Sequence, residues 1–127
     1  MSKKKIIKTD KAPSAIGPYS QAVVTSQFLF TSGQLPIDPV TGKTQIGDIE
    51  DQTHRVFKNL TAIAIEAGTT FDHAVKTTVY LSDINDFTRV NKIYAQYFKE
   101  PFPARSAFQV AALPLGADVE VEAVFQL

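Results

Sequence analysis

The strictest pattern in this chain lies at its C-terminal end, in residues 119–126. Apolar side chains from Val119 to Phe125 occupy every second position, and Glu120, Glu122 and a valine lie between them. A period of two is that of a β-strand, whose side chains point alternately to the two faces of a sheet. The segment is therefore predicted to be a strand with one apolar face, and both carboxylates share the other face.

A cationic group precedes this strand. Arg105 lies between the rigid Pro103 and another β-prone run, a setting that restrains a guanidinium. The arginine and the two carboxylates thus bracket a short hairpin-like unit, which is the best candidate for chemistry in the chain. The alternative is a structural ion pair of Arg105 with Glu120 or Glu122.

Size and residue usage limit the possibilities. A chain of 127 residues is predicted to form a single domain, 1–127. It has no cysteine, which excludes a disulfide framework, a thiolate zinc site and a cysteine nucleophile. Neither His54 nor His73 has ligands at metal-binding spacing, so we expect no metal, and His54 is expected in solvent. With no signal-type segment and no long apolar run, we expect a cytoplasmic protein that does not associate with membranes.

Charge is distributed unevenly. Five of the thirteen basic residues lie within the first eleven positions, whereas residues 12–127 carry eight basic and twelve acidic groups. A nucleic-acid surface needs clustered lysine and arginine to displace counterions. The acidic body of the chain therefore argues against a nucleic-acid partner, and the N-terminal lysines are interpreted as a solubilising end.

Periodicity and turn residues predict the remaining elements. The expected order is a short edge strand at 6–7, strands at 20–25 and 28–32, a helix from residue 51 ended by Gly68, a strand at 75–81, a helix at 84–98 capped by Ser82 or Asp83, and two C-terminal strands. This order predicts an α+β sandwich. Two helices cover only one face of such a sheet, so another copy of the protein is expected to cover the other face, with pockets at the subunit boundaries.

Four further positions are candidates for a site. Gly33 ends a strand and lets backbone N–H groups approach a ligand, and the hydroxyl of Ser32 can donate to an oxyanion; a plain strand exit is the alternative. Tyr19 follows Gly-Pro and is either a packed aromatic or a pocket wall. Asn91 lies on the apolar stripe of the second helix, where a buried amide must be hydrogen-bonded to a loop or face a site.

Familiar catalytic motifs are absent. The sequence has no Gly-x-Ser-x-Gly elbow, no Walker lysine loop, no Gly-x-Gly-x-x-Gly after a strand and no His-Glu-x-x-His. Arginine, carboxylates, hydroxyls and backbone amides remain. These groups suit a small anionic substrate and a reaction with water.

Several blocks, in order along nearly the whole chain, resemble the RidA (YjgF) family of reactive intermediate imine deaminases. They are 15–22 (AIGPYSQA), 31–36 (TSGQLP), 76–81 (KTTVYL), 90–91 (VN), 103–106 (PARS) and 119–123 (VEVEA). The resemblance implies a chorismate-mutase-like sandwich, in which a mixed sheet carries two helices on one face. It also implies a homotrimer with a central barrel and clefts between subunits.

The resemblance further implies an activity and roles for particular residues. The reaction is the cofactor-independent hydrolysis of 2-aminoacrylate, 2-iminopropanoate and 2-iminobutanoate to 2-oxo acids and ammonia. Arg105 would bind the substrate carboxylate, and Ser32 with the backbone of Gly33 would hold the carboxylate or the attacking water. Tyr19 would line the pocket from the neighbouring subunit, and Asn91 would support it.

Glu120 occupies the family position that orients or activates water, and Glu122 is the alternative. Many members carry a cysteine where this chain has Ala107, so thiol-linked regulation is not expected here. Two other functions are weighed beside the deaminase. One is a non-catalytic regulatory protein that binds a small carboxylate, and the other is the RNA-cleaving role that the family has also been given, which the acidic body disfavours.

Overall fold

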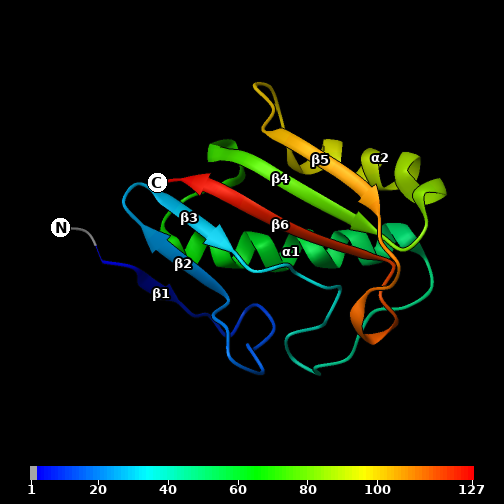
Figure 1. The fold of residues 1–127 in the computed structure, drawn as a ribbon, viewed down its shortest axis with the longest axis horizontal. Coiled ribbons are helices and arrows are strands. Elements are labelled where there is room, and N and C mark those ends of the chain that lie inside the picture. The colour runs from blue at the N-terminus through cyan, green and yellow to red at the C-terminus, as the bar shows by residue number, and fades with distance from the viewer. Residues whose placement is uncertain (1–2) are drawn as a thin grey trace.

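The structure is a computed structural model that describes residues 3–127, and it is built on one six-stranded sheet with two helices on one side (Figure 1). The strands are β1 (Lys5–Ile7), β2 (Ala22–Thr25), β3 (Phe28–Thr31), β4 (Ala74–Leu81), β5 (Ala104–Gln109) and β6 (Val119–Gln126). The helices are α1 (Ile49–Ala67) and α2 (Phe87–Tyr97), with 3₁₀ turns η1 (Phe71–His73), η2 (Ile84–Asp86) and η3 (Pro114–Gly116). The α+β architecture with both helices on one face is as expected.

The sheet is mixed, with strand order β1-β2-β3-β6-β4-β5. Only β4 and β5 run parallel, and α2 connects them in the crossover that parallel neighbours require. The prediction of a C-terminal hairpin was wrong, because β4 lies between β5 and β6. The strict alternation of β6 suits a central strand, and β4, rich in β-branched residues, pairs with it on one side and with β5 on the other.

The N-terminal hairpin and the edge strand are confirmed. Thr25 pairs with Phe28, so the turn between β2 and β3 has two residues. Ser26 takes a left-handed conformation there, with φ 53°, in place of the usual asparagine or glycine. Strand β1 pairs with β2 and forms one edge of the sheet.

Capping groups set the helix boundaries. Helix α1 begins two residues earlier than predicted, because the Asp48 carboxylate accepts hydrogen bonds from the N–H groups of Glu50 and Asp51. It ends at Gly68, which has a left-handed φ of 87°, as expected. The second helical segment starts as η2 with Asp83 as its N-cap, and the α-helix proper follows at Phe87.

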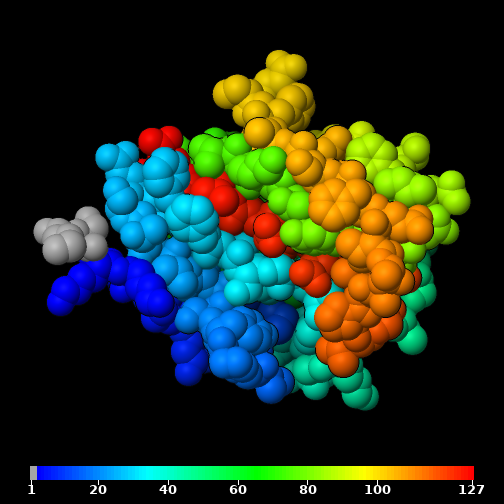
Figure 2. All heavy atoms as spheres, viewed as in Figure 1, coloured from blue at the N-terminus to red at the C-terminus, as the bar shows by residue number. Residues whose placement is uncertain are grey.

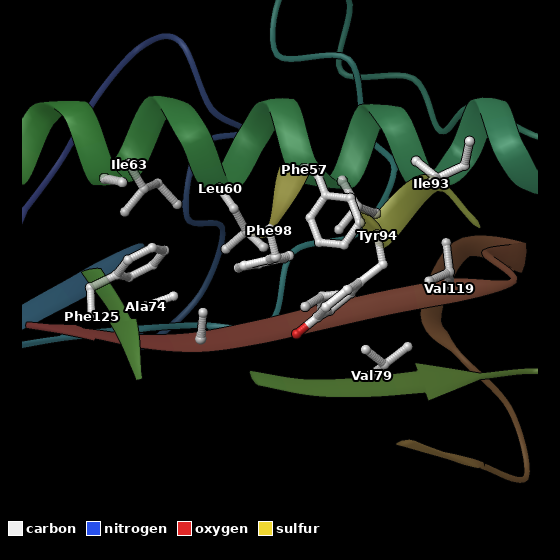
Figure 3. Packing of buried hydrophobic residues seen from close by; sticks show 14 of the residues in the cluster. Phe57, Leu60, Ile63, Ala74, Val79, Ile93, Tyr94, Phe98, Val119 and Phe125 are labelled. Carbon is white, nitrogen blue, oxygen red and sulfur yellow. The ribbon is translucent and has the colours of Figure 1, made fainter. Parts of the chain in front are cut away.

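The core lies between the two helices and the sheet (Figure 3). Phe57 of α1 meets Phe98 edge to face with ring centroids 5.6 Å apart, and Leu60 and Phe125 are fully buried in the same cluster. His54 was expected in solvent, and this was wrong: its ring is half-buried, with Nδ1 2.9 Å from the hydroxyl oxygen of Tyr97, because α2 packs beside it. Within residues 3–127, neither helix combines the length and the apolar content that a bilayer crossing demands.

The sheet face opposite the helices carries exposed apolar side chains. Figure 2 looks onto this face, where atoms of β3, β6, β4 and β5 lie side by side. Phe28, Phe30 and Phe108 are all exposed on these strands. These exposed apolar side chains are a surface that a second copy could cover. That a second copy does cover it remains a prediction.

Candidate functional site

Arg105 lies on the edge strand β5 and is packed against α2. Its Nη1 donates a hydrogen bond to Asn91 Oδ1 at 2.7 Å. The guanidinium carbon lies 4.6 Å from the ring centroid of Tyr94 and 5.1 Å from that of Phe87. Among residues 3–127 Arg105 takes part in no ion pair, so the alternative of a structural pair with Glu120 or Glu122 is wrong.

A cavity of about 400 Å³ opens beside this guanidinium. One end is polar, formed by Arg105 and Asn91, and the other walls are apolar: Tyr94, Ala95, Phe102 and Pro103. A cation at the end of an apolar cavity is suited to the carboxylate of a small organic acid.

Asn91 was predicted to be buried, and this was wrong. Asn91 is exposed, while Val90, Ile93 and Tyr94 are the buried residues of α2. Of the two roles left open for Asn91, the structure supports the second, because the amide oxygen accepts a hydrogen bond from Arg105.

Glu120 lies on β6, on the sheet face away from the helices, and Glu122 shares that face as predicted. The carboxylate of Glu120 is half-buried against Gly33. A methyl group built on Gly33 would overlap Glu120 Oε2 and lie 2.8 Å from its carboxyl carbon. Glycine is therefore needed here for close approach. Burial, and then the charge of Glu122, raise the pKa of Glu120.

The strand exit at Ser32 and Gly33 is held on both sides. The backbone N–H of Ser32 donates to Gln21 O at 2.9 Å, and its hydroxyl donates to Ser20 O at 2.6 Å. On the other side, Gln34 exchanges two backbone hydrogen bonds with Val121. The N–H of Gly33 makes no hydrogen bond with any residue from 3 to 127, which leaves it available to a ligand.

These contacts revise the expectation for Ser32. Its hydroxyl hydrogen is already committed to the carbonyl of Ser20, so toward a ligand the oxygen can only accept. The same hydrogen bond ties the Tyr19 loop to the Gly33 loop. Tyr19 itself is 52% exposed, which leaves it accessible to a neighbouring molecule.

Buried amides that the sequence reading missed hold these loops in place. Gln21 donates to the carbonyl oxygens of Thr9 and Pro13, and it accepts from the N–H of Thr9. Asn59 of α1 donates to the carbonyls of Leu35 and Ile37, just beyond Gly33. Asn59 lies on the apolar stripe of its helix, and an amide at such a position is the signal that could have revealed it.

Within one chain the structure does not bring Arg105 and Glu120 together. Arg105 pairs with Thr77 of β4, whereas Glu120 pairs with Tyr80, three positions along the same strand. With two strand spacings between β5 and β6, the two backbone positions are about 14 Å apart. The side chains also point to opposite faces, since Arg105 packs against α2 and Glu120 lies away from the helices. One small molecule cannot contact both.

Comparison with known proteins identifies the family. The sequence profile described as Endoribonuclease L-PSP matches residues 9–126. The chain belongs to this family, which is the RidA (YjgF) family. The resemblance stated from the sequence is therefore confirmed over nearly the whole chain.

Relatives of this RidA-family chain are similar in sequence and fold. A human protein named 2-iminobutanoate/2-iminopropanoate deaminase is 51% identical over 121 residues, which cover 95% of this chain and 88% of that protein. A Rid-family crystal structure from Yersinia pestis superposes with a TM-score of 0.96 at 52% identity, covering 98% and 100% of the two chains. The Escherichia coli protein TdcF, solved with bound serine, has a TM-score of 0.91 at 42% identity, covering 97% and 98%.

The names of these relatives divide. Mammalian RidA-family proteins at about 50% identity are named imine deaminases, while others of similar identity carry only RutC names. The mixed six-stranded sheet with two helices matches the solved neighbours. The comparisons thus support RidA-type deaminase activity in general terms.

Proposed function

We propose that this RidA-family chain hydrolyses small 2-imino and 2-enamino acids to 2-oxo acids and ammonia, without a cofactor, in clefts between identical subunits. The observation that carries the proposal is the arginine beside a cavity. Arg105 is free of carboxylate partners among the described residues, yet it is held by Asn91 at the polar end of the cavity.

Arg105 binds the substrate carboxylate in this proposal. A guanidinium has five N–H donors in a planar fork, and Asn91 uses one of them. The remaining donors can hold a carboxylate through two parallel hydrogen bonds, each contributing about 1.5–3 kcal/mol. TdcF was solved with serine, an amino acid that carries the same α-carboxylate.

A second copy supplies the other half of the site. Arg105 and Glu120 of one chain face opposite sides of the sheet, so the glutamate near a given arginine must come from a neighbouring chain. Glu120, the N–H of Gly33 and the Tyr19 ring form that second half. The exposed apolar sheet face supports assembly, and the homotrimer implied by the sequence is the assembly we propose.

Glu120 serves as the acid–base group. Water attacks the carbon of the protonated imine while the carboxylate of Glu120 takes one of the water's protons, and a tetrahedral carbinolamine forms. Glu120 then passes this proton to the nitrogen. The C–N bond breaks, and ammonia leaves as the hydroxyl group gives its proton back to Glu120 and becomes the carbonyl. A pKa raised by burial makes Glu120 a stronger base than an exposed glutamate, which supports its choice over Glu122.

The second candidate function is a regulatory protein that binds a small carboxylate without turning it over. The cavity beside Arg105 would serve it equally well. The RNA-cleaving role that the family description names has less support, because residues 12–127 carry a net negative charge. The cytoplasmic location also remains a prediction.

The test measures ammonia release from imines that an amino-acid oxidase generates in the presence of catalase. Wild-type protein is expected to accelerate release above the spontaneous rate. Arg105→Lys keeps the charge but loses the fork, and it is expected to lower kcat/KM by roughly ten- to a hundredfold. Arg89→Lys is the matched control, since Arg89 lies in surface ion pairs with Asp48 and Glu50 away from the cavity.

The outcomes separate the candidates. Saturable binding of a 2-oxo acid without ammonia release would favour the regulatory protein. Full activity in Arg105→Lys, with the Arg89 control also active, would refute the role of the guanidinium.

A further inference from the structure

We infer that Tyr94 and Thr77 are positioning residues for Arg105: a buried pair of hydroxyl groups fixes the aromatic face on which the guanidinium lies. The inference rests on the proposed function, because it concerns the arginine that binds the substrate carboxylate. Neither residue carries a charge or touches the reacting atoms in that proposal.

The guanidinium of Arg105 lies against one face of α2. Phe87, Asn91 and Tyr94 are spaced at i, i+4 and i+7 along α2, so they share one face of the helix. All three contact Arg105: the guanidinium carbon lies over both rings, and the amide oxygen accepts a hydrogen bond. One stripe of one helix therefore determines where the cation lies.

The Tyr94 ring in this stripe is itself held in place by buried contacts. The hydroxyl groups of Tyr94 and Thr77 are 2.8 Å apart in the buried interior, where Thr77 is 0% exposed and Tyr94 is 6% exposed. Figure 3 shows the Tyr94 oxygen directed at the sheet below the helices. Phe57 packs edge to face against the Tyr94 ring, with centroids 5.8 Å apart. The ring is thus held from behind by both packing and a hydrogen bond.

Thr77 also links Tyr94 back to the strand that carries Arg105. Thr77 is the residue of β4 that pairs with Arg105 of β5 in the parallel ladder. The backbone of Thr77 therefore pairs with the backbone of Arg105 in the sheet. Its hydroxyl group contacts Tyr94, whose ring lies against the Arg105 side chain. Strand, helix and guanidinium form a closed set of contacts, which limits rotation of the long side chain before substrate arrives.

The energetic reason concerns side-chain entropy. An unrestrained arginine loses rotamer freedom when it is immobilised on a ligand. A cation held over an aromatic face has already lost part of that freedom, and the attraction to the ring adds to the restraint. The benefit should appear in substrate binding, because the stacking is the same before and after reaction.

The experiment measures kcat and KM for imine hydrolysis, the Kd of 2-oxobutanoate by calorimetry, and the NMR shifts of the Arg105 Hδ protons, which the rings displace. Tyr94→Leu removes the nearer of the two rings and leaves Phe87, and it is expected to raise KM and Kd about fivefold, with kcat within about threefold and the Hδ shifts moved toward those of an unstacked arginine. Tyr94→Phe and Thr77→Val each remove one hydroxyl and should raise KM about threefold. Because they break one shared link, the double variant should be no worse than either single one.

Tyr97→Leu is the matched control. Tyr97 lies on the same helix and packs on Phe57 at 4.9 Å between ring centroids, but it is not among the contacts of Arg105. It should lower thermal stability and leave KM within about twofold of the wild type. If Tyr94→Leu fails to fold, the two hydroxyl variants decide the question.

Two results would overturn the inference. One is an unchanged KM and unchanged Hδ shifts in a folded Tyr94→Leu variant, and the other is a Tyr97→Leu variant that raises KM as much as Tyr94→Leu. If the wild-type protein releases no ammonia, the proposed function fails, and 2-oxobutanoate binding with the Hδ shifts then decides the positioning role alone.

Discussion

Gly33→Ala tests the second half of the site with the smallest possible change. Gly33 has an ordinary backbone conformation, so alanine meets no strain there. The added methyl instead overlaps Glu120 Oε2 and lies 2.8 Å from the carboxyl carbon, with Cγ at 3.1 Å. Since carbon atoms in contact prefer 3.5–4.0 Å, the carboxylate must move by about 1 Å.

The size of the effect follows from that movement. A misplacement of about 1 Å in a catalytic group can cost roughly a hundredfold in rate, so kcat is expected to fall by about that factor. Stability should change little, because the displaced atoms are the end of a flexible side chain. Removing a glycine stabilises by about 0.4–1 kcal/mol through the unfolded chain, and an off-rotamer Glu120 costs a similar amount.

The assay is ammonia release by four proteins: wild type, Gly33→Ala, Glu120→Ala and the double variant. In the Glu120→Ala background the methyl meets no carboxylate, so Gly33→Ala should cost nothing further there. If Gly33→Ala keeps activity within about threefold of wild type, the reasoning is refuted. An equal loss in both backgrounds would also refute it, because the methyl would then be acting on something other than Glu120.

Two further predictions concern stability. Burial, followed by the charges of Asp83 and Asp118, raises the pKa of Asp86. The folded chain therefore binds the carboxyl proton of Asp86 more tightly than the unfolded chain does. The free energy of unfolding then falls as the pH rises from the unfolded to the folded pKa of this group. Asp86→Asn should therefore raise the melting temperature at pH 7, with the gain lost well below pH 3.8, the ordinary value of aspartate; an equal gain at low pH would contradict this. The second prediction concerns Gln52, which is 0% exposed and exchanges hydrogen bonds with Asp118 at 2.8 and 2.9 Å. Gln52→Leu leaves these partners without hydrogen bonds and should lower the free energy of unfolding, measured by urea titration, by about 2–3 kcal/mol. The exposed Gln96→Leu is its control, and an equal loss there would refute the role of the buried contacts.

Local patterns in the sequence were sufficient to place most of the secondary structure. The alternation of residues 119–126 predicted β6, and the helical stripe ended by Gly68 predicted α1, because burial on one side imposes a period that a single segment displays. The neighbour of each strand is a different kind of information. Nothing in residues 104–126 alone states that β4 lies between the last two strands, since that depends on the crossover through α2.

The same distinction applies to the candidate site. Arg105 and Glu120 were predicted as functional residues, and the structure places each in a suitable local setting. Their placement on opposite faces could not be read from their spacing, because it depends on which face of β5 meets the helix. The Tyr94 and Thr77 hydroxyl groups were missed because residues of this kind on apolar stripes are usually packing residues.

Surface arginines in this chain can form ion pairs, and Arg105 differs from Arg89 in this respect. Arg89 contacts both Asp48 and Glu50, at 3.1 and 3.2 Å, although all three side chains are on the surface. Glu120 and Glu122, by contrast, share a sheet face, and no basic side chain within residues 3–127 forms an ion pair with either. The half-buried carboxylate of Glu120 is unfavourable without a basic partner, whereas Arg105 is exposed to solvent and keeps donors free for an anion. Glu120 gains a cation nearby if an apolar face of one copy brings its glutamate to the arginine of the next, and a small anion with an electrophilic carbon then fits between them.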